Sequence, residues 1–169
     1  FVRRQLIWLG LAAVTVFLVN RFDYHWWRGT PLLTVGFSLL VVLALLLVFV
    51  PGIGGKVKGS YRWLNLGPLR MQPSEFAKIL TVIAVSVWMD RIGWRVRQFT
   101  KGAFLPGCGL ALLAGLLVME PDFGSTLVVC VAGGALMYVA GTRVVYLLLF
   151  GGLGLAGVGA FLITNANRM

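Results

Sequence analysis

Long apolar stretches alternate with short polar segments along this chain of 169 residues. The apolar stretches are almost free of charged side chains and cover residues 5–19, 31–50, 76–89, 103–119, 125–140 and 144–163. A helix needs about 20 residues to cross the roughly 30 Å hydrocarbon core of a bilayer. Because these stretches approach or reach that length, the pattern predicts an all-α, polytopic integral membrane protein with six spans.

The overall composition also indicates a bilayer environment. Hydrophobic residues make up 59% of the chain and charged residues 12%, whereas soluble domains average about half apolar and a quarter charged. Polar segments with glycine and proline separate the stretches and favour turns there. We expect residues 1–169 to form a single transmembrane domain. We expect this domain to be incomplete, with both ends of the chain as truncation points, because the sequence starts without Met and stops just after an apolar stretch.

A charged pair lies at the start of the third apolar stretch. Glu75 and Lys78 are three residues apart, which places both side chains on one face of a helix. Pro73 suits the first helical position, and Glu75 suits the positively polarised first turn. An ammonium inside a bilayer costs about 2.5 kcal/mol or more at the centre unless it is paired or faces water. We predict a helix over 72–89 in which this pair faces other helices, either as an ion pair that seats the helix or as part of a cavity wall.

A second polar site is the very short turn at 120–124. By the parity of the predicted spans, this turn lies on the same membrane face as the polar loop at 51–74. Glu120, Asp122 and Arg62 should therefore share one side of the membrane. Asp122 suits the start of the next helix, and the alternative is that these carboxylates act as a general base or bind a cation.

The loop around Arg62 is too polar to span a bilayer and too apolar for a free linker. Tyr61 and Trp63 flank Arg62, and aromatic side chains gather at the headgroup level of membranes. The sequence therefore predicts an interfacial or re-entrant segment. The planar guanidinium of Arg62 could bind a diphosphate, or it could pair with ordinary lipid headgroups.

Positive charge is divided almost evenly between the two predicted faces, although Lys and Arg normally concentrate in cytoplasmic loops. One face carries Arg21, Arg28, Arg91, Arg95, Arg97, Lys101 and Arg143. The other carries Arg3, Arg4, Lys56, Lys58, Arg62, Arg70 and Arg168. The dense cluster at 91–101 favours the first face as cytoplasmic. The basic surplus on the opposite face indicates either an anionic substrate or headgroup contact there.

Three motifs together carry a family resemblance. They are Arg-Trp-Leu-Asn-Leu-Gly at 62–67, Gln-Pro-Ser-Glu-x-x-Lys at 72–78 and Glu-Pro-Asp-Phe-Gly at 120–124. They resemble the SEDS family (shape, elongation, division and sporulation), which includes the FtsW/RodA/SpoVE group of bacterial peptidoglycan polymerases. The resemblance covers essentially the whole chain, which would correspond to about the second to seventh spans of the family. Glu120 and Phe123 look closer to the division members than to the elongation members.

The resemblance implies a peptidoglycan glycosyltransferase in cell division or cell wall synthesis. Such an enzyme would polymerise lipid II at the bacterial cytoplasmic (inner) membrane and release undecaprenyl diphosphate. The family's catalytic aspartate would lie outside this chain, so we assign no catalytic residue here and expect the fragment alone to be inactive. By the family pattern, Glu75 and Lys78 line the central cavity, and Arg62 and Gln72 flank it. The candidate substrate-binding residues are Arg62, Gln72, Ser74, Glu75, Lys78, Glu120 and Asp122.

The family also implies particular partners. We expect a class B penicillin-binding protein, other proteins of the division or elongation complexes, and membrane lipids, with no nucleic acid. Two cysteines and one histidine are too few for a zinc site. We expect no metal and no cofactor in this chain, and allow for a divalent cation in the complete enzyme. The alternative functions are a flippase or transporter of lipid-linked cell wall precursors and a membrane scaffold that recruits a transpeptidase.

Overall fold

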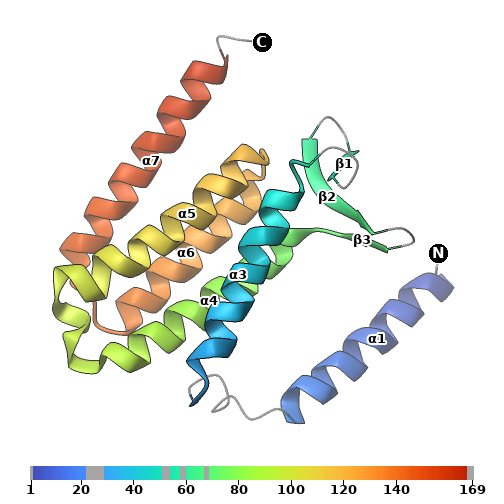
Figure 1. Cartoon of the computed structure of the whole chain (residues 1–169), viewed down its shortest axis with the longest axis horizontal. Helices are drawn as coiled ribbons and strands as arrows, with labels where there is room; N and C mark the ends of the chain where they lie inside the picture. The colour runs from blue at the N-terminus through green and yellow to red at the C-terminus, as the bar shows by residue number, and fades with distance from the viewer. Residues whose placement is uncertain (1, 22–28, 51–53, 58–59, 67–68, 167–169) are drawn as a thin grey trace.

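The computed structural model describes residues 2–21, 29–50, 54–57, 60–66 and 69–166. Its α-helices in this part of the chain are α1 (Val2–Arg21), α3 (Pro31–Leu47), α4 (Pro73–Ile92), α5 (Leu105–Met119), α6 (Phe123–Val139) and α7 (Val144–Ala166). A 3₁₀-helix, η1 (Gly93–Arg97), and a π-helix, η2 (Phe99–Phe104), join α4 to α5. The strands β1 (Gly54–Val57), β2 (Ser60–Leu66) and β3 (Leu69–Met71) lie between α3 and α4. Figure 1 shows the arrangement of these elements.

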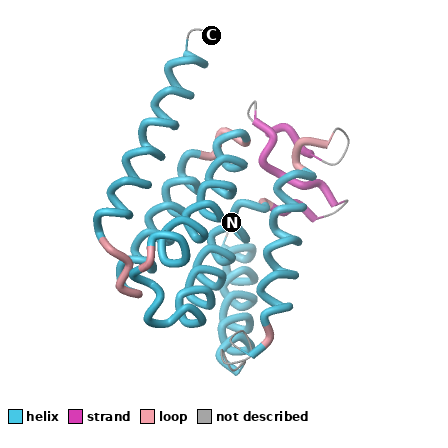
Figure 2. Tube along the Cα trace, turned by 60° about the vertical axis from the view of Figure 1, so that its left-hand side comes forward, coloured by secondary structure: helices cyan, strands magenta, loops and turns pink. Residues whose placement is uncertain are grey.

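Four helices form the packed centre of the molecule. Helix α4 contacts both α3 and α6, and α5 packs against α6. Figure 1 shows these four helices, and Figure 2 shows the strands at one end of the helices. The shared core contains Val41, Leu45, Ala77, Leu80, Leu113, Leu117 and Val129. Lipid tails are as apolar as these side chains, so moving the side chains from lipid into the helix interface yields little hydrophobic free energy. Van der Waals packing therefore holds the helices together.

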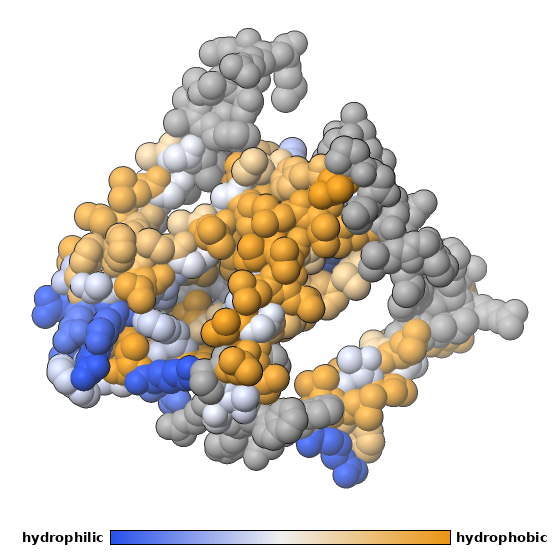
Figure 3. Space-filling model, in the orientation of Figure 1, coloured by the Kyte–Doolittle hydropathy of each residue, from blue (hydrophilic) through white to orange (hydrophobic). Residues whose placement is uncertain are grey.

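The two outer helices are more loosely attached. All described side chains of α1 are exposed, and α1 lies to one side of the other helices in Figure 1. Helix α7 packs on the bundle near its start, where Tyr146, Leu147 and Phe150 join a second apolar cluster around Met137. Apolar side chains cover much of the outer surface in Figure 3, and such a surface suits contact with lipid.

The six predicted helical segments are confirmed in position. One continuous segment, Phe99–Met119, is long and apolar enough to cross a membrane by length and composition within the described part of the chain. The other apolar segments that satisfy the composition are shorter, namely Leu9–Arg21, Leu32–Leu47, Phe123–Val139 and Val144–Gly154. The described α-helices agree with the six predicted spans in number. Their apolar lengths support the count only in part, because most are shorter than a full span.

The segment predicted to be interfacial or re-entrant forms strands, so the fold is not purely helical; its interfacial position stays a prediction. Strands β1, β2 and β3 form an antiparallel sheet in that order. Strand β2 has aromatic residues at alternate positions, Tyr61 and Trp63, a composition that favours strands. The side chain of Leu64 is buried. Because side chains two residues apart share a face of a strand, Arg62 lies on the same face as Leu64.

Antiparallel helix packing gives the bundle two polar ends. The sheet end comprises the three strands, residues 72–75 at the start of α4 and the turn at 120–123. The basic end comprises residues 91–101 and the turn at 140–143. The Thr142 hydroxyl donates a hydrogen bond to the carbonyl oxygen of Gly102, the residue after the first segment, at 3.1 Å. Hydrophilic side chains gather at this end (Figure 3). Three of the basic residues assigned to the two membrane faces, Arg28, Lys58 and Arg168, lie outside the described residues.

Candidate functional site

The site begins at the start of α4. Gln72 has extended backbone angles and occupies the N-cap position, and Pro73 is the first helical residue, where its missing N–H leaves no bond unmade. The side chain of Ser74 is fully buried. The predicted helix start is therefore confirmed, and Gln72 and Ser74 are held where α4 meets the turn at 120–123.

Asp122 caps the start of α6. Its Oδ1 accepts a hydrogen bond from the backbone N–H of Ser125 at 3.3 Å, and its carbonyl oxygen accepts one from the Thr126 hydroxyl at 2.8 Å. A carboxylate at this position satisfies a free N–H and meets the positive end of the helix dipole. The expectation that Asp122 stabilises the next helix is confirmed.

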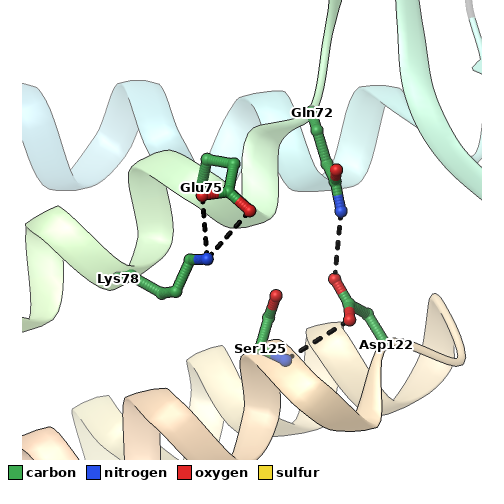
Figure 4. Close-up of polar contacts among 5 residues, drawn as sticks. All are labelled: Gln72, Glu75, Lys78, Asp122 and Ser125. Carbon is green, nitrogen blue, oxygen red and sulfur yellow. Dashed lines mark hydrogen bonds and ion pairs between the residues drawn. The ribbon is translucent and has the colours of Figure 1, made fainter.

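The same carboxylate also joins two helices. The other oxygen, Oδ2, accepts a hydrogen bond from Nε2 of Gln72 at 3.3 Å, so that Asp122 links the start of α6 to the start of α4 (Figure 4). Burial acts to raise the pKa of Asp122, but the Ser125 hydrogen bonds and the proximity of Ser74 and Arg62 outweigh it and hold the pKa below its ordinary value. The Ser74 hydroxyl approaches this carboxylate without reaching hydrogen-bond geometry, since it has no bonded partner within the described ranges. Asp122 is therefore ionised in the folded protein.

Arg62 connects the sheet to the turn between α5 and α6. Its Nε donates to the carbonyl oxygen of Glu120 at 3.2 Å, and its Nη2 donates to the carbonyl oxygen of Pro121. The prediction that the Arg62 and Glu120 regions lie on one face is confirmed. The guanidinium reaches main-chain carbonyls rather than carboxylates, so Arg62 fixes the position of this turn.

Glu120 is a buried acid without a compensating bond. Its side chain is 0% exposed, and neither carboxylate oxygen has a hydrogen-bond partner among the described residues. Burial raises the pKa of Glu120 to about 8, the neighbouring charge of Asp122 adds to this, and Arg62 opposes it. Because a buried unpaired carboxylate is costly in its charged form, Glu120 is mostly protonated at neutral pH.

Glu75 and Lys78 form an ion pair on the surface of α4. The Lys78 ammonium lies 2.8 Å from each oxygen of the Glu75 carboxylate, and Figure 4 shows the pair running along the helix, separate from the contacts of Asp122. The side chain of Glu75 is 58% exposed and that of Lys78 is 29% exposed.

The prediction that both members of this pair face other helices was wrong for Glu75 in the described part of the chain. The positions of α4 that pack on the bundle near its start are Ser74, Ala77 and Thr81. Glu75 follows the buried Ser74 directly, so the helical repeat turns it away from this stripe. Lys78 lies at the edge of the stripe and is half-buried.

The seven candidate residues thus fall into two groups at the sheet end. Arg62, Gln72, Ser74, Glu120 and Asp122 converge on the turn between α5 and α6, whereas Glu75 and Lys78 pair with each other on α4. Sequence reasoning missed Ser125 and Thr126, which both donate to Asp122; the N-cap position of Asp122 was the signal that could have found them. Within the described ranges, no three His, Cys, Asp or Glu side chains are close enough together to hold a metal ion.

Comparison with known proteins gives consistent results. The chain is 37% identical over its full length to a protein of Trichlorobacter lovleyi named as a probable peptidoglycan glycosyltransferase FtsW, and covers 44% of that protein. The crystal structure of the rod shape determining protein RodA of Thermus thermophilus matches 89% of this chain and 49% of its own, with a TM-score of 0.70 and 28% identity. A chain from a peptidoglycan synthase complex matches 96% of this chain and 46% of its own, with a TM-score of 0.74 and 29% identity.

These coverages mean that the chain spans somewhat less than half the length of the curated relative. The family model described as cell cycle protein, FtsW/RodA/SpoVE, matches residues 1–169. The resemblance seen in the three sequence motifs is thereby confirmed. Proteins of this family are membrane proteins, and the apolar helices of this chain agree with that. The chain belongs to the FtsW/RodA/SpoVE family of cell cycle proteins.

Proposed function

We propose that the full-length protein is a peptidoglycan glycosyltransferase that polymerises lipid II at the outer face of the bacterial cytoplasmic membrane and releases undecaprenyl diphosphate. The observation that carries this proposal is the gathering of the family's polar motifs at one end of the bundle, where Arg62 binds the turn that holds Glu120 and Asp122. The relative from Trichlorobacter lovleyi is named as a probable peptidoglycan glycosyltransferase, which supports the proposed class of reaction. The sheet end would face the substrate.

The reaction needs a base for the acceptor hydroxyl and positive charge for the departing diphosphate. Lys78 is the described cation best placed to supply that charge, because the Lys78 side chain is partly exposed and its ammonium is oriented by the ion pair with Glu75. An ammonium has three donors, so a phosphate oxygen can bind Lys78 while Glu75 keeps it oriented. The base is assigned to the part of the protein outside this chain.

Arg62, Gln72 and Asp122 have a supporting role in this proposal. Gln72 and Asp122 join the starts of α4 and α6, and Arg62 ties the sheet to the same turn. These bonds fix the height and direction of the first turn of α4, and therefore of Lys78. Positioning of this kind matters because small displacements of a charged group weaken its stabilisation of a developing anion.

The proposed partner is a class B penicillin-binding protein, within a division or elongation complex. The support is the structural match to a chain of a peptidoglycan synthase complex that coordinates polymerization and crosslinking, as the name of that structure states. We further propose a multi-pass location in the bacterial inner membrane. A divalent cation in the full-length enzyme stays a prediction, and the steps proposed for Lys78 do not depend on it.

The test is polymerisation by the purified full-length protein with its partner in lipid nanodiscs that contain lipid II. The expected product is a ladder of glycan strands that a muramidase digests. The partner must carry an inactivated transpeptidase site, so that crosslinking does not hide the ladder. The proposal fails if lipid II is not polymerised. Movement of a fluorescent lipid II across vesicles would then favour a flippase, and binding of the partner without polymerisation or lipid movement would favour a scaffold.

A further inference from the structure

A groove lies on the outside of the bundle, away from the candidate site. It has a volume of about 280 Å³ and runs between α3 and α5, with α4 beneath it. Its walls include Val42 from α3, Val85 and Trp88 from α4, and Leu105, Gly109 and Leu112 from α5. Leu105 and Leu112 are exposed at its edge, so the groove opens to the surroundings of the helices.

The hydroxyl groups that line the groove are already hydrogen-bonded, so a molecule that enters the groove needs no polar group to pair with them. The two hydroxyls in its lining are bonded to their own helices, since Ser38 donates to the carbonyl oxygen of Thr34 at 2.7 Å and Thr81 donates to that of Ala77 at 2.9 Å. Pockets for small molecules usually measure about 300–1,000 Å³ and contain several polar groups that fix orientation. This groove is smaller and apolar, so it suits a single alkyl chain rather than a polar ligand.

One end of the groove is marked by Trp88. The indole ring lines the groove, while its Nε1 donates to the carbonyl oxygen of Lys101 at 2.9 Å. Tryptophan places its apolar ring in hydrocarbon and its N–H toward the headgroups at a membrane interface. Trp88 therefore marks the level at which the apolar groove gives way to the basic end.

The basic end carries a surplus of positive charge beside this boundary. Between residues 91 and 101 there are four cations and no acid, and the adjoining Asp90 reduces the surplus to three. The side chain of Lys101 is exposed. Its backbone carbonyl oxygen accepts the hydrogen bond from Trp88, so Lys101 lies beside this end of the groove. A juxtamembrane cation favours an anionic lipid by about 1 kcal/mol. The charge at this end therefore complements a negative headgroup.

From these observations we propose that the groove between α3, α4 and α5 binds one alkyl chain of an anionic phospholipid, whose headgroup contacts Lys101 at the basic end. The lipid belongs to the leaflet opposite the sheet end, so this site is distinct from the proposed substrate site. The apolar walls hold the chain, Trp88 sets its depth, and Lys101 selects the charge of the headgroup.

The test measures contact between lipid and Trp88 in the full-length protein. A variant whose only tryptophan is Trp88 is placed in phosphatidylcholine nanodiscs that contain a fixed fraction of either phosphatidylglycerol or phosphatidylcholine with brominated acyl chains, which quench indole fluorescence on contact. We expect brominated phosphatidylglycerol to associate about fivefold more strongly, the preference that one cation confers. Lys101→Gln should remove this preference.

Filling the groove supplies a matched pair of variants. A side chain added at Gly109 meets no atom within 4 Å at its Cβ, and the same is true of Gly115 on the same helix, which does not line the groove. Gly109→Leu should abolish the excess quenching, whereas Gly115→Leu should leave it. If Gly109→Leu does not fold, Ser38→Leu fills the groove from the α3 wall.

Two results would overturn this proposal. Equal quenching by the two brominated lipids would show ordinary contact with the surrounding lipid rather than a site. An absence of quenching would show that another part of the full-length protein covers the groove. The readout is fluorescence rather than polymerisation, so neither result bears on the proposed enzymatic function.

Discussion

Arg62 and Glu120 meet through the main chain of Glu120 and not through its carboxylate. The Nε of Arg62 donates to the Glu120 carbonyl oxygen at 3.2 Å, while the carboxylate oxygens of Glu120 have no hydrogen-bond partner in the described part of the chain. The guanidinium of Arg62 and the carboxyl group of Glu120 therefore lie close in space without a hydrogen bond between them. Arg62 orders the turn, and Glu120 stays in its neutral form.

The neutral form of Glu120 predicts a pH-dependent stability. Its pKa in the folded protein, about 8, lies above the ordinary value of 4.5. Between these values the unfolded chain has lost a proton that the folded protein keeps, so the free energy of unfolding falls as pH rises. Glu120→Gln should remove this loss. We expect the free energy of unfolding of the variant to exceed that of the wild type by on the order of a few kcal/mol at pH 8. Near pH 4.5 the two should differ little, as measured by thermal unfolding in detergent.

The control for this prediction is Glu75→Gln, which removes an exposed carboxylate at the same end of the bundle. It should not reproduce the gain of Glu120→Gln at pH 8, because this carboxylate is exposed. An equal gain for Glu120→Gln at pH 4.5 and pH 8 would contradict the prediction, because the gain would then not depend on the protonation of this carboxylate.

The two bonds of Arg62 predict that lysine cannot replace it. A lysine keeps the charge but lacks the planar fork that reaches both the Glu120 and the Pro121 carbonyl oxygens. We expect Arg62→Lys to reduce the free energy of unfolding by about 1.5–3 kcal/mol, the value of a hydrogen bond to a charged group. Hydrogen exchange at 122–126 should become faster. Arg97→Lys, at the basic end, is the control, and a similar effect there would contradict the assignment.

Lys78 is predicted to be needed for activity and not for folding. If Lys78 stabilises the departing diphosphate, Lys78→Met in the full-length protein should reduce lipid II polymerisation by about 10²–10³-fold. Thermal stability should be unchanged or higher, because ion pairs that are partly removed from water often cost as much as they return. Arg143→Met, which removes an exposed cation at the opposite end, should retain full polymerisation.

A charge exchange separates this role from simple pairing. The double variant Glu75→Lys with Lys78→Glu keeps an ion pair of the same spacing on α4 but moves the ammonium by about one helical turn. It should stay inactive if Lys78 binds substrate. Activity near that of the wild type would show that the two side chains merely satisfy each other.

Gly133 is predicted to be essential for the packing of α6 on α5. A Cβ at this position would lie 2.5 Å from Cδ2 of Leu110, whereas one at the adjacent Gly134 would meet nothing within 4 Å. Gly133→Val should therefore destabilise the protein by about 1–3 kcal/mol through overpacking, and Gly134→Val should not. Thermal unfolding of the two variants, side by side, checks this; equal stability would mean that Leu110 moves aside at no cost.

The sequence by itself determined the helices and the family. Apolar stretches separated by short polar segments predicted each helical segment, because a chain in lipid must satisfy its backbone hydrogen bonds within its own segment. Pro73 and Asp122 predicted two helix starts correctly, since caps depend on neighbouring backbone groups and are local. The three polar motifs were sufficient to indicate the family, and span parity was sufficient to place Arg62 and Glu120 on one face.

Only the tertiary structure decided how these polar residues are paired. The segment around Arg62 contains too few residues per strand for its pattern to separate a small sheet from an interfacial loop, and strand pairing depends on contacts between distant residues. The spacing of Glu75 and Lys78 fixed their common face, but which face of α4 packs on α6 depends on the partner helix. The neutral state of Glu120 likewise arises from burial, a property of the packed bundle that the turn sequence alone does not contain.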